Sequence, residues 1–256
     1  MEIRISHTPD PIFENPRLVS IYDAFDGERE DLPHYLVLAS EISKEIEKDS
    51  KSLNVLDLGC GTGQLAYLLK ANGYRVTAVD PALASLEWAQ KKPHAQSITW
   101  VHGDASVLPS REFDIAFMTG NVAQVFLSDT DWSIALRHIK RSMLAGGHLI
   151  FETRNSERKA WTEWNRKNTF TTKNIPGIGK VDGWCEVLNV SADLVRFRWT
   201  YVFENDGAVL TSDSTLRFRE REEIETTLTR SGFTINSVRE APDRPGKELV
   251  FICKTS

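Results

Sequence analysis

The chain has 256 residues, 41% of them hydrophobic, and a net charge of −5 at pH 7. This length and composition suit a globular protein with one large core, and the acidic balance argues against a broad surface for nucleic acids. The sequence has no apolar run of about 18 residues and no basic and apolar leader at its start, so we expect a cytoplasmic protein without a membrane partner. Cys60, Cys185 and Cys253 lie far apart, a spacing that indicates neither a disulfide framework nor a metal site.

Strand and helix patterns alternate through the first part of the chain. About fifty residues with a largely helical pattern come first, and residues 33–50 are the strongest helix candidate among them. Strands are then predicted over 53–58, 74–80, 97–104, 113–121 and 146–154, and helices over 64–73, 82–92 and 131–144. Strands that alternate with helices at this spacing predict a parallel sheet covered on both faces. We expect the N-terminal helical segment to lie across that sheet as a lid.

The pattern changes after Arg154. Residues 155–183 are polar, and strands rich in β-branched and aromatic residues are predicted over 184–190, 194–203 and 209–219. These strands indicate an antiparallel β-insert, after which a helix over 219–232 and strands over 233–241 and 248–255 resume the α/β pattern. Three regions are therefore expected, namely a lid with the cofactor-binding core over 1–154, a substrate-covering insert over 155–218, and the rest of the core over 219–256.

The segment DLGCGTG, residues 57–63, stands between the first predicted strand and the helix that follows it. Glycines there let the backbone adopt positive φ and approach a ligand closely. The N-terminus of the next helix offers free N–H donors and a partial positive charge. Since ligands of open α/β sheets bind beyond the carboxyl ends of the strands, we expect a carboxylate or phosphate group of a ligand at this loop.

Two more acids end the next two strands. Asp80 ends the second strand at a distance beyond the last glycine that is typical of an acid that binds ribose hydroxyls. Asp104 ends the third strand and precedes Ala105, a context that suits the exocyclic amine of adenine. The glycine loop and the two acids together predict a cofactor that contains adenosine and lies across three strand ends.

The segments VLDLGCGTG, VTAVDPA, VHGDAS, FDIAFMTGN and LAGGHLIFET resemble, in order and at the usual intervals, the signature segments of the class I S-adenosylmethionine-dependent methyltransferases. The segment IYDAFDGEREDLPHYLVLA is similar to the N-terminal lid of the small-molecule branch of that superfamily, which often carries a β-insert before its last helix. The resemblance implies a Rossmann-like, seven-stranded, mostly parallel sheet with helices on both faces, and S-adenosylmethionine as the cofactor. Ala145 stands where many relatives have proline, a loop detail without consequence for the chemistry.

The resemblance also implies cofactor contacts at the strand ends. Asp57 would order the loop or accept a hydrogen bond from the amino group of the methionine part, Asp80 would bind ribose, and Asp104 would bind adenine. Tyr22 and Tyr35 would close over the cofactor, Tyr35 reaching its carboxylate, or would only pack the lid. The full expected cofactor set is Tyr22, Tyr35, Asp57, Gly59, Cys60, Gly61, Gly63, Asp80, Pro81, Asp104, Ala105, Thr119, Gly120 and Asn121.

The methyl acceptor is expected near the insert. Trp161 and Trp164 stand in a polar segment that we predict to be helical, and they are candidates to contact an apolar, aromatic or cationic acceptor. Arg154 would either meet an acidic acceptor or pair with a nearby carboxylate. His34 is a candidate general base by its location alone, with a solvated helix histidine as the alternative. No metal ligand set is expected.

These features predict transfer of a methyl group to an oxygen or nitrogen atom of a small molecule by a monomer or homodimer. A nucleic-acid acceptor is not expected, because residues 119–122 read TGNV and lack the Asn-Pro-Pro-Tyr type of motif that receives a flipped base. Two alternatives stay open. One is a non-catalytic S-adenosylmethionine-binding protein, and the other is an NAD-dependent oxidoreductase, because GTGQLA at residues 61–66 also fits the dinucleotide fingerprint.

Overall fold

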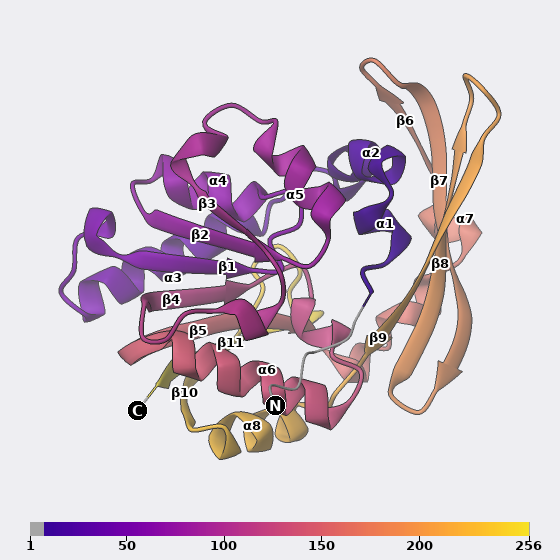
Figure 1. Ribbon diagram of the computed structural model, residues 1–256. Helices are drawn as coiled ribbons and strands as arrows, with labels where there is room; N and C mark the ends of the chain where they lie inside the picture. The colour runs from indigo at the N-terminus through magenta and orange to yellow at the C-terminus, as the bar shows by residue number, and fades with distance from the viewer. Residues whose placement is uncertain (1–7, 256) are drawn as a thin grey trace.

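The computed structural model describes residues 8–255, so residues 1–7 of the predicted first region and Ser256 of the last lie outside the described residues. A central sheet of seven strands has the order β10-β11-β5-β4-β1-β2-β3 (Figure 1). Its strands are β1 (Asn54–Leu58), β2 (Arg75–Asp80), β3 (Thr99–His102), β4 (Phe113–Met118), β5 (Met143–Arg154), β10 (Phe233–Glu240) and β11 (Glu248–Thr255). The pairs among β1 to β5 are parallel, and β11 runs antiparallel to both of its neighbours. The predicted mostly parallel, seven-stranded sheet is confirmed.

The strand order reverses at β1. From β1 the chain proceeds to β2 and β3 on one side, and then crosses to β4 and β5 on the other. A crevice at such a switch point is where open α/β sheets bind their ligands. The DLGCGTG segment begins inside β1 and ends at Gly63, immediately before α4 (Gln64–Ala71).

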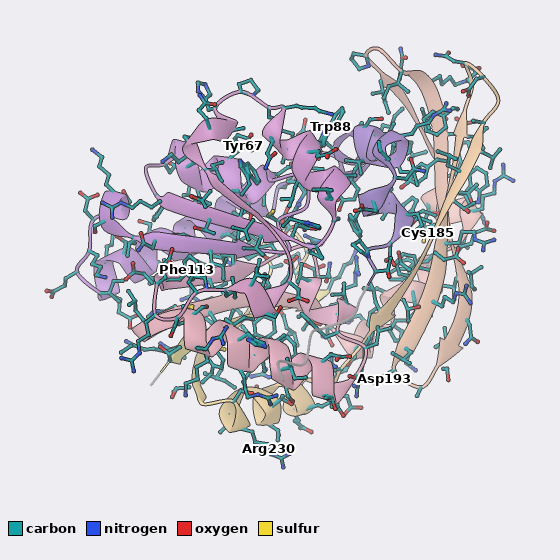
Figure 2. The ribbon with its side chains drawn as sticks, viewed as in Figure 1. Tyr67, Trp88, Phe113, Cys185, Asp193 and Arg230 are labelled. Carbon is teal, nitrogen blue, oxygen red and sulfur yellow. The ribbon has the colours of Figure 1, made fainter. Side chains whose placement is uncertain are left out.

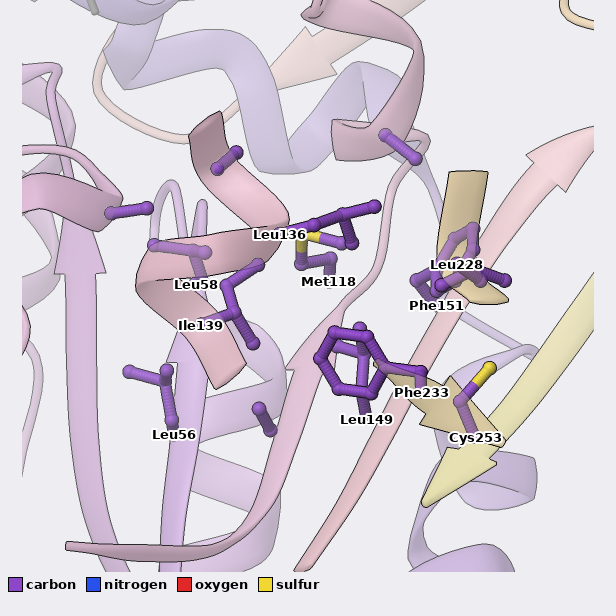
Figure 3. Packing of buried hydrophobic residues seen from close by; sticks show 14 of the residues in the cluster. Leu56, Leu58, Met118, Leu136, Ile139, Leu149, Phe151, Leu228, Phe233 and Cys253 are labelled. Atoms are coloured by element: carbon purple, nitrogen blue, oxygen red, sulfur yellow. The ribbon is translucent and has the colours of Figure 1, made fainter. Parts of the chain in front are cut away.

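Helices cover both faces of the sheet because the strands send alternate residues to opposite sides. On one face, Leu56 and Leu58 of β1 share a core cluster with Leu136 and Ile139 of α6 (Asp129–Ser142), shown in Figure 3, and α8 (Arg221–Arg230) adds Leu228. On the other face, α3 (Leu32–Glu45) and α4 pack against the sheet and bury Tyr35, Leu38, Ala39, Ile42, Leu65 and Leu69. Asp57 follows Val55 of that second cluster by two residues and so faces the side of α3 and α4.

Short elements and caps complete the core. Helix α5 (Leu83–Gln90) follows β2, and single turns of 3₁₀ helix occur at η1 (Ser50–Ser52), η2 (Ala95–Ser97), η3 (Ala105–Val107) and η4 (Val122–Val125). The Ser128 hydroxyl accepts a hydrogen bond from the Asp131 N–H, which caps α6. The Asn15 side chain accepts from the Arg17 N–H at the start of α2 (Pro16–Asp26), where Pro16 also favours the first turn.

The insert is an antiparallel sheet of four strands, β6 (Thr171–Ile175), β7 (Gly179–Ser191), β8 (Leu194–Phe203) and β9 (Val209–Arg217), in that order. Figure 1 shows it standing beside the central sheet. The sequence predicts three of these strands and misses β6, because its residues, TTKNI, are mostly polar and pair only along one edge of β7. The helix predicted around Trp161 and Trp164 is wrong, since that stretch holds only η5 (Ser156–Arg158), η6 (Ala160–Glu163) and α7 (Arg166–Thr169).

The N-terminal helices divide their contacts between the two sheets. Whereas α3 packs on the central sheet, α1 (Pro11–Glu14) and α2 lie between the core and the insert (Figure 1). Ile12, Leu18 and Ile21 share a buried cluster with residues of β7 and β8. The Arg17 guanidinium lies 3.8 Å from the ring centroid of Phe203 and pairs with Asp206 at 2.8 Å. Helix α2 is therefore the part of the predicted lid that joins the insert to the core.

Candidate cofactor and acceptor site

The glycine loop is anchored to the end of the neighbouring strand. The Gly59 N–H donates to the Val79 carbonyl at 2.7 Å, and Gly59, Gly61 and Gly63 have φ values of 75°, 52° and 80°. A Cβ atom on Gly59 would lie 2.4 Å from Cγ2 of Val122, whereas a Cβ on Gly61 would meet nothing within 4 Å. The loop is therefore packed at Gly59 and bare at Gly61, where a ligand can approach the backbone.

Asp57 lies beneath this loop as a buried carboxylate, and only 1% of its surface is exposed. Neither of its oxygens has a hydrogen-bond partner among the described residues. Burial, and then the charge of Asp80, raise its pKa to about 7, while Arg29 and the Ala66 N–H lower it. A carboxylate in this position favours a ligand group that donates hydrogen bonds and carries positive charge.

The Asp80 carboxylate connects the end of β2 to the glycine loop. One oxygen accepts from the Gly61 N–H and the other from the Ala82 N–H, both at 2.7 Å. Burial raises the pKa of Asp80, and these two backbone donors lower it. Pro81 beside it is exposed, and Cys60 in the loop is partly exposed. Burial raises the pKa of the Cys60 thiol well above its usual value, so the sulfur stays neutral.

The end of β3 lies beside the end of β2, because Asp80 pairs with His102 in the parallel register. Asp104 caps η3 by accepting from the Ser106 N–H at 2.7 Å, and Ala105 is buried. The structure therefore brings the three predicted strand-end acids, Asp57, Asp80 and Asp104, to one edge of the sheet.

The residues after β4 form the other wall of this edge. Thr119 and Asn121 are buried, Gly120 is exposed, and Gly120 and Asn121 have φ values of 68° and 65°. The Oδ1 atom of Asn121 has no partner among the described residues. The Gly120 N–H donates to Oε1 of Glu152 at 2.7 Å, so a carboxylate of β5 holds this turn.

Glu152 is a site residue that the sequence predictions missed. Its side chain is fully buried, and its second oxygen accepts a hydrogen bond from the Tyr35 hydroxyl. Tyr35, expected at the cofactor carboxylate, is thus already engaged by the protein. The signal in the sequence is an acid inside the apolar strand segment LIFET, where an unpaired charge is costly.

Glu248 of β11 lies next to Glu152 and was also missed. Burial, followed by the charge of Glu152, raises the pKa of Glu248 to about 7. Arg244 pairs with Glu248 at 2.9 Å. Glu248 therefore holds a proton more readily than an ordinary glutamate does.

The remaining lid candidates are Tyr22 and His34. Tyr22 packs against Phe13 with ring centroids 5.4 Å apart, in the cluster between α2 and the insert, and burial raises its pKa. The Nε2 atom of His34 is buried without a hydrogen-bond partner among residues 8–255. Burial and the charge of Arg239 lower the pKa of His34, which keeps the imidazole neutral near pH 7.

Asp23 of α2 connects the lid to the glycine loop, a contact that the sequence does not reveal. Its carboxylate accepts from the Thr62 hydroxyl at 2.5 Å, from Nε2 of Gln64 at 3.0 Å and from Nζ of Lys92 at 2.7 Å. Thr62 and Gln64 belong to the glycine loop and the start of α4, and Lys92 follows α5, so only the folded chain brings these donors to Asp23. We refer to Asp23, Thr62, Gln64 and Lys92 as the α2 latch.

The predicted acceptor residues meet at the junction of β5 and the insert. The Arg154 N–H donates to the buried Gln124 side chain at 3.3 Å, and its guanidinium lies 5.2 Å from the ring centroid of Trp164. Trp161 packs edge-on against Phe218 at 4.4 Å between ring centroids. Both tryptophans thus border the aromatic core of the insert.

Residues 8–255 offer neither a metal site nor a membrane-spanning helix. No group of three or more His, Cys, Asp and Glu side chains is arranged to hold a metal ion. No helix within that range is long and apolar enough to cross a membrane.

Residues 55–147 match a family model described as a methyltransferase domain. A cypemycin N-terminal methyltransferase from Streptomyces sp is 32% identical over 139 residues, which cover 52% of this chain and 56% of that protein. The chain spans about half the length of the first curated relatives that it matches.

Solved structures resemble the chain over almost its whole length. An S-adenosylmethionine-dependent methyltransferase from Clostridium acetobutylicum superimposes with a TM-score of 0.73 at 19% identity, covering 94% of this chain and 99% of that one. S-adenosylmethionine-bound CalS10, an amino pentose methyltransferase from Micromonospora echinaspora, gives 0.71 at 17% identity and covers 98% and 100%. The likeness therefore extends over the insert and the N-terminal helices as well as the central sheet.

Proposed function

We propose that this chain, which has the fold of the class I S-adenosylmethionine-dependent methyltransferases, transfers a methyl group from S-adenosylmethionine to an oxygen or nitrogen atom of a small molecule. The observation that carries the proposal is the buried carboxylate of Asp57, unpartnered among the described residues, beneath a glycine loop that is bare at Gly61. That combination suits the amino acid end of the cofactor, which has an ammonium and a carboxylate close together.

The two charges of a methionine tail have complementary groups here. Asp57 accepts from the ammonium, and the first-turn N–H groups of α4 donate to the carboxylate. A pyrophosphate would instead bring two negative charges towards Asp57, whose pKa the charge of Asp80 already raises. This repulsion favours S-adenosylmethionine over NAD.

The adenosine end would lie along β2 and β3. Each Asp80 oxygen accepts one backbone hydrogen bond, and its remaining lone pairs are available to ribose hydroxyls. One oxygen of Asp104 accepts from the Ser106 N–H, and the other is available to the exocyclic amine of adenine. Cys60, Pro81 and Ala105 flank these acids and line the same strand ends.

Positioning is the main contribution of the protein to catalysis. S-adenosylmethionine, when bound, supplies a methyl group on a positively charged sulfur, which a neutral or anionic nucleophile can accept in one displacement. Good alignment of such groups is worth about 7 to 11 kcal/mol. Glu152 fixes the Thr119–Asn121 turn by accepting the Gly120 N–H, and α1, α2 and the insert exclude water from the space above it.

A small-molecule acceptor is supported by the printed names of structural neighbours, which include an amino pentose methyltransferase and a sugar N-methyltransferase. Arg154 and Trp164 are our proposed acceptor residues, since they meet between β5 and the insert. A general base is not assigned, because His34 lies next to Arg239 and Asp243, on the β10 and β11 side of α3. A cytoplasmic location, the absence of a nucleic-acid partner, and a monomeric or homodimeric state stay predictions.

Incubation with S-adenosylmethionine labelled in its methyl group, together with a metabolite extract, tests the proposal. We expect label to appear in a small molecule, and we expect Asp57→Asn to reduce transfer while Arg166→Gln, an exposed change on the insert, leaves it unchanged. Cofactor binding without any transfer would favour the non-catalytic alternative. The absence of both binding and transfer would contradict the proposal.

A further inference from the structure

Arg154 occupies a junction between the two sheets. It is the last residue of β5, and it lies two residues beyond Glu152 and opposite Glu248 in the antiparallel register. Because alternate residues of a strand share a face, Arg154 and Glu152 point to the same side of the central sheet. The charge of Arg154 also reaches Cys185, a buried residue of β7 in the insert (Figure 2).

The guanidinium of Arg154 lacks the carboxylate partner that its neighbours have. Arg244 pairs with Glu248 at 2.9 Å, and Arg29 pairs with Asp31 at 2.7 Å. Within residues 8–255 the Arg154 guanidinium makes no hydrogen bond or ion pair, and Glu248 and Glu152 act on it only at longer range. A guanidinium presents five N–H donors, and among the described residues none of those of Arg154 is used.

The Arg154 side chain is largely enclosed by the protein but keeps contact with solvent. Burial is the largest influence on its pKa and lowers it, yet the side chain keeps part of its surface exposed. One side of the guanidinium lies over the indole of Trp164, at 5.2 Å. Its N–H edge is therefore available to a ligand that enters between β5 and the insert.

The same groups argue against a cationic acceptor. The oxygens of Glu152 are occupied by Tyr35 and by the Gly120 N–H, and one face of Trp164 already carries the cation of Arg154. Arg244 has its own carboxylate partners, Glu248 at 2.9 Å and Asp243 at 2.7 Å, whereas the Arg154 guanidinium pairs with no carboxylate among the described residues. The local charge is thus complementary to an anion.

We propose that Arg154 binds an oxyanion of the methyl acceptor, a carboxylate or a phosphate, and so selects anionic acceptors at this site. The inference rests on the proposed function, because it concerns the second substrate of that reaction. A planar guanidinium offers two parallel N–H donors to such a group, a geometry that a lysine cannot reproduce.

Binding of small probes to the complex with S-adenosylhomocysteine tests this assignment directly. Benzoate, phenyl phosphate and the neutral benzamide share an aromatic ring that suits the tryptophan-rich junction. Isothermal titration is expected to show benzoate or phenyl phosphate binding at least about tenfold more tightly than benzamide, as a charge-assisted hydrogen bond requires. The tighter of the two oxyanions identifies whether a carboxylate or a phosphate is the natural group.

Three variants locate the binding group. Arg154→Gln is expected to weaken oxyanion binding about tenfold or more without changing benzamide binding, and Arg154→Lys is expected to restore part of it. Arg166→Gln is the matched control, because Arg166 is exposed and lies 4.3 Å from the ring centroid of Trp184, in a second arginine–tryptophan pair that belongs to α7 and β7 of the insert. Equal affinities for benzoate and benzamide, or an unchanged affinity in Arg154→Gln, would overturn the assignment.

The proposed function is checked separately in the same experiment. S-adenosylhomocysteine is titrated first into the wild type and into Arg154→Gln, and equal binding is expected. If this ligand binds and no oxyanion does, the acceptor assignment is wrong while the methyltransferase proposal stands. In a second arm, a metabolite extract is separated on an anion exchanger at pH 7, and acceptor activity is expected in the retained fraction; activity confined to the unretained fraction contradicts the assignment.

Discussion

Asp57 destabilises the ligand-free fold at neutral and alkaline pH. Its pKa is raised to about 7 in the folded chain, compared with about 3.9 in an unfolded one. Between these values the folded state keeps a proton that the unfolded state releases, so the free energy of unfolding falls as the pH rises through this window. The Asp57 carboxylate thus lowers the free energy of unfolding of the ligand-free protein, and it provides a negative charge that a ligand can bind.

The first prediction is that Asp57→Asn removes this pH dependence. Relative to the wild type, the melting temperature of the variant should rise between pH 4 and pH 8, because the variant has no carboxyl to ionise at that position. Thermal unfolding without ligand at several pH values measures the difference. Melting temperatures of the two proteins that change in parallel over that range would mean that folding does not raise the pKa of Asp57.

The second prediction concerns the affinity for S-adenosylmethionine. Because the ammonium of the cofactor needs the ionised carboxylate, the affinity should increase as the pH rises towards about 7 and level off above it. In Asp57→Asn the affinity should be roughly tenfold weaker or more, and flat over the same range. Titrations at pH 5.5, 6.5 and 8 test both parts, and a wild-type affinity independent of pH would contradict the role given to Asp57.

The third prediction separates two glycines of one loop. A Cβ on Gly61 meets nothing within 4 Å, and its φ of 52° costs an alanine about 1 kcal/mol. Gly61→Ala should therefore weaken cofactor binding with a small change in stability. Gly59→Ala places a Cβ 2.4 Å from Val122 and should mainly destabilise the fold. Melting temperatures and cofactor affinities of both variants provide the test, and equal effects on stability would show that Gly61 is packed like Gly59.

At the scale of elements, the α2 latch connects cofactor binding to the position of the N-terminal helices. Asp23 accepts hydrogen bonds from Thr62, Gln64 and Lys92, and α2 packs on the insert through Leu18 and Ile21. Release of the latch frees the glycine loop from α2 while leaving the apolar contacts in place. The latch is accordingly suited to control ligand exchange.

The fourth prediction is that Asp23→Ala accelerates dissociation of S-adenosylhomocysteine by about tenfold, because a charge-assisted contact is lost and affinity changes appear mainly in dissociation rates. Stopped-flow fluorescence of the tryptophans measures the rate. Asp206→Asn is the control, since it removes an exposed ion pair with Arg17 of the same helix, and such exposed pairs contribute little to stability. Equal rates in the wild type and Asp23→Ala would exclude a latch.

The elements that the sequence predicts best are those with strong hydrophobic periodicity. Strands β1, β4 and β5 and helix α6 are found where apolar residues recur with the correct spacing. Strand β6 was missed because an edge strand needs little apolar surface, and the short helices before it were misjudged because tryptophans in a polar segment look amphipathic. Edge pairing and insert packing depend on tertiary contacts that local patterns do not encode.

At the scale of the whole molecule, the sequence predicted which strand ends lie together, but it did not predict the other acids of the site. Asp57, Asp80 and Asp104 come together because the carboxyl ends of parallel strands share one edge. Glu152, Glu248 and Asp23 were not predicted, since their partners lie on elements distant in the sequence. The only trace of Glu152 in the sequence is an acid within the apolar strand segment LIFET.

The fifth prediction uses the stability of the whole chain. S-adenosylhomocysteine at 100 times its dissociation constant should add about 2.7 kcal/mol to the free energy of unfolding. For a chain of this size the melting temperature should rise by about 5 to 10 °C. Differential scanning calorimetry measures the shift, and NAD at equal concentration, which should produce none, is the control.

An isothermal titration of the wild-type protein with S-adenosylmethionine, run beside one with NAD, tests the central claim most directly. The account predicts saturable one-to-one binding of S-adenosylmethionine with a dissociation constant between about 1 μM and 1 mM, the usual range for enzyme substrates, and no heat from NAD. Saturable binding of NAD, with no heat from S-adenosylmethionine at millimolar concentration, would contradict it.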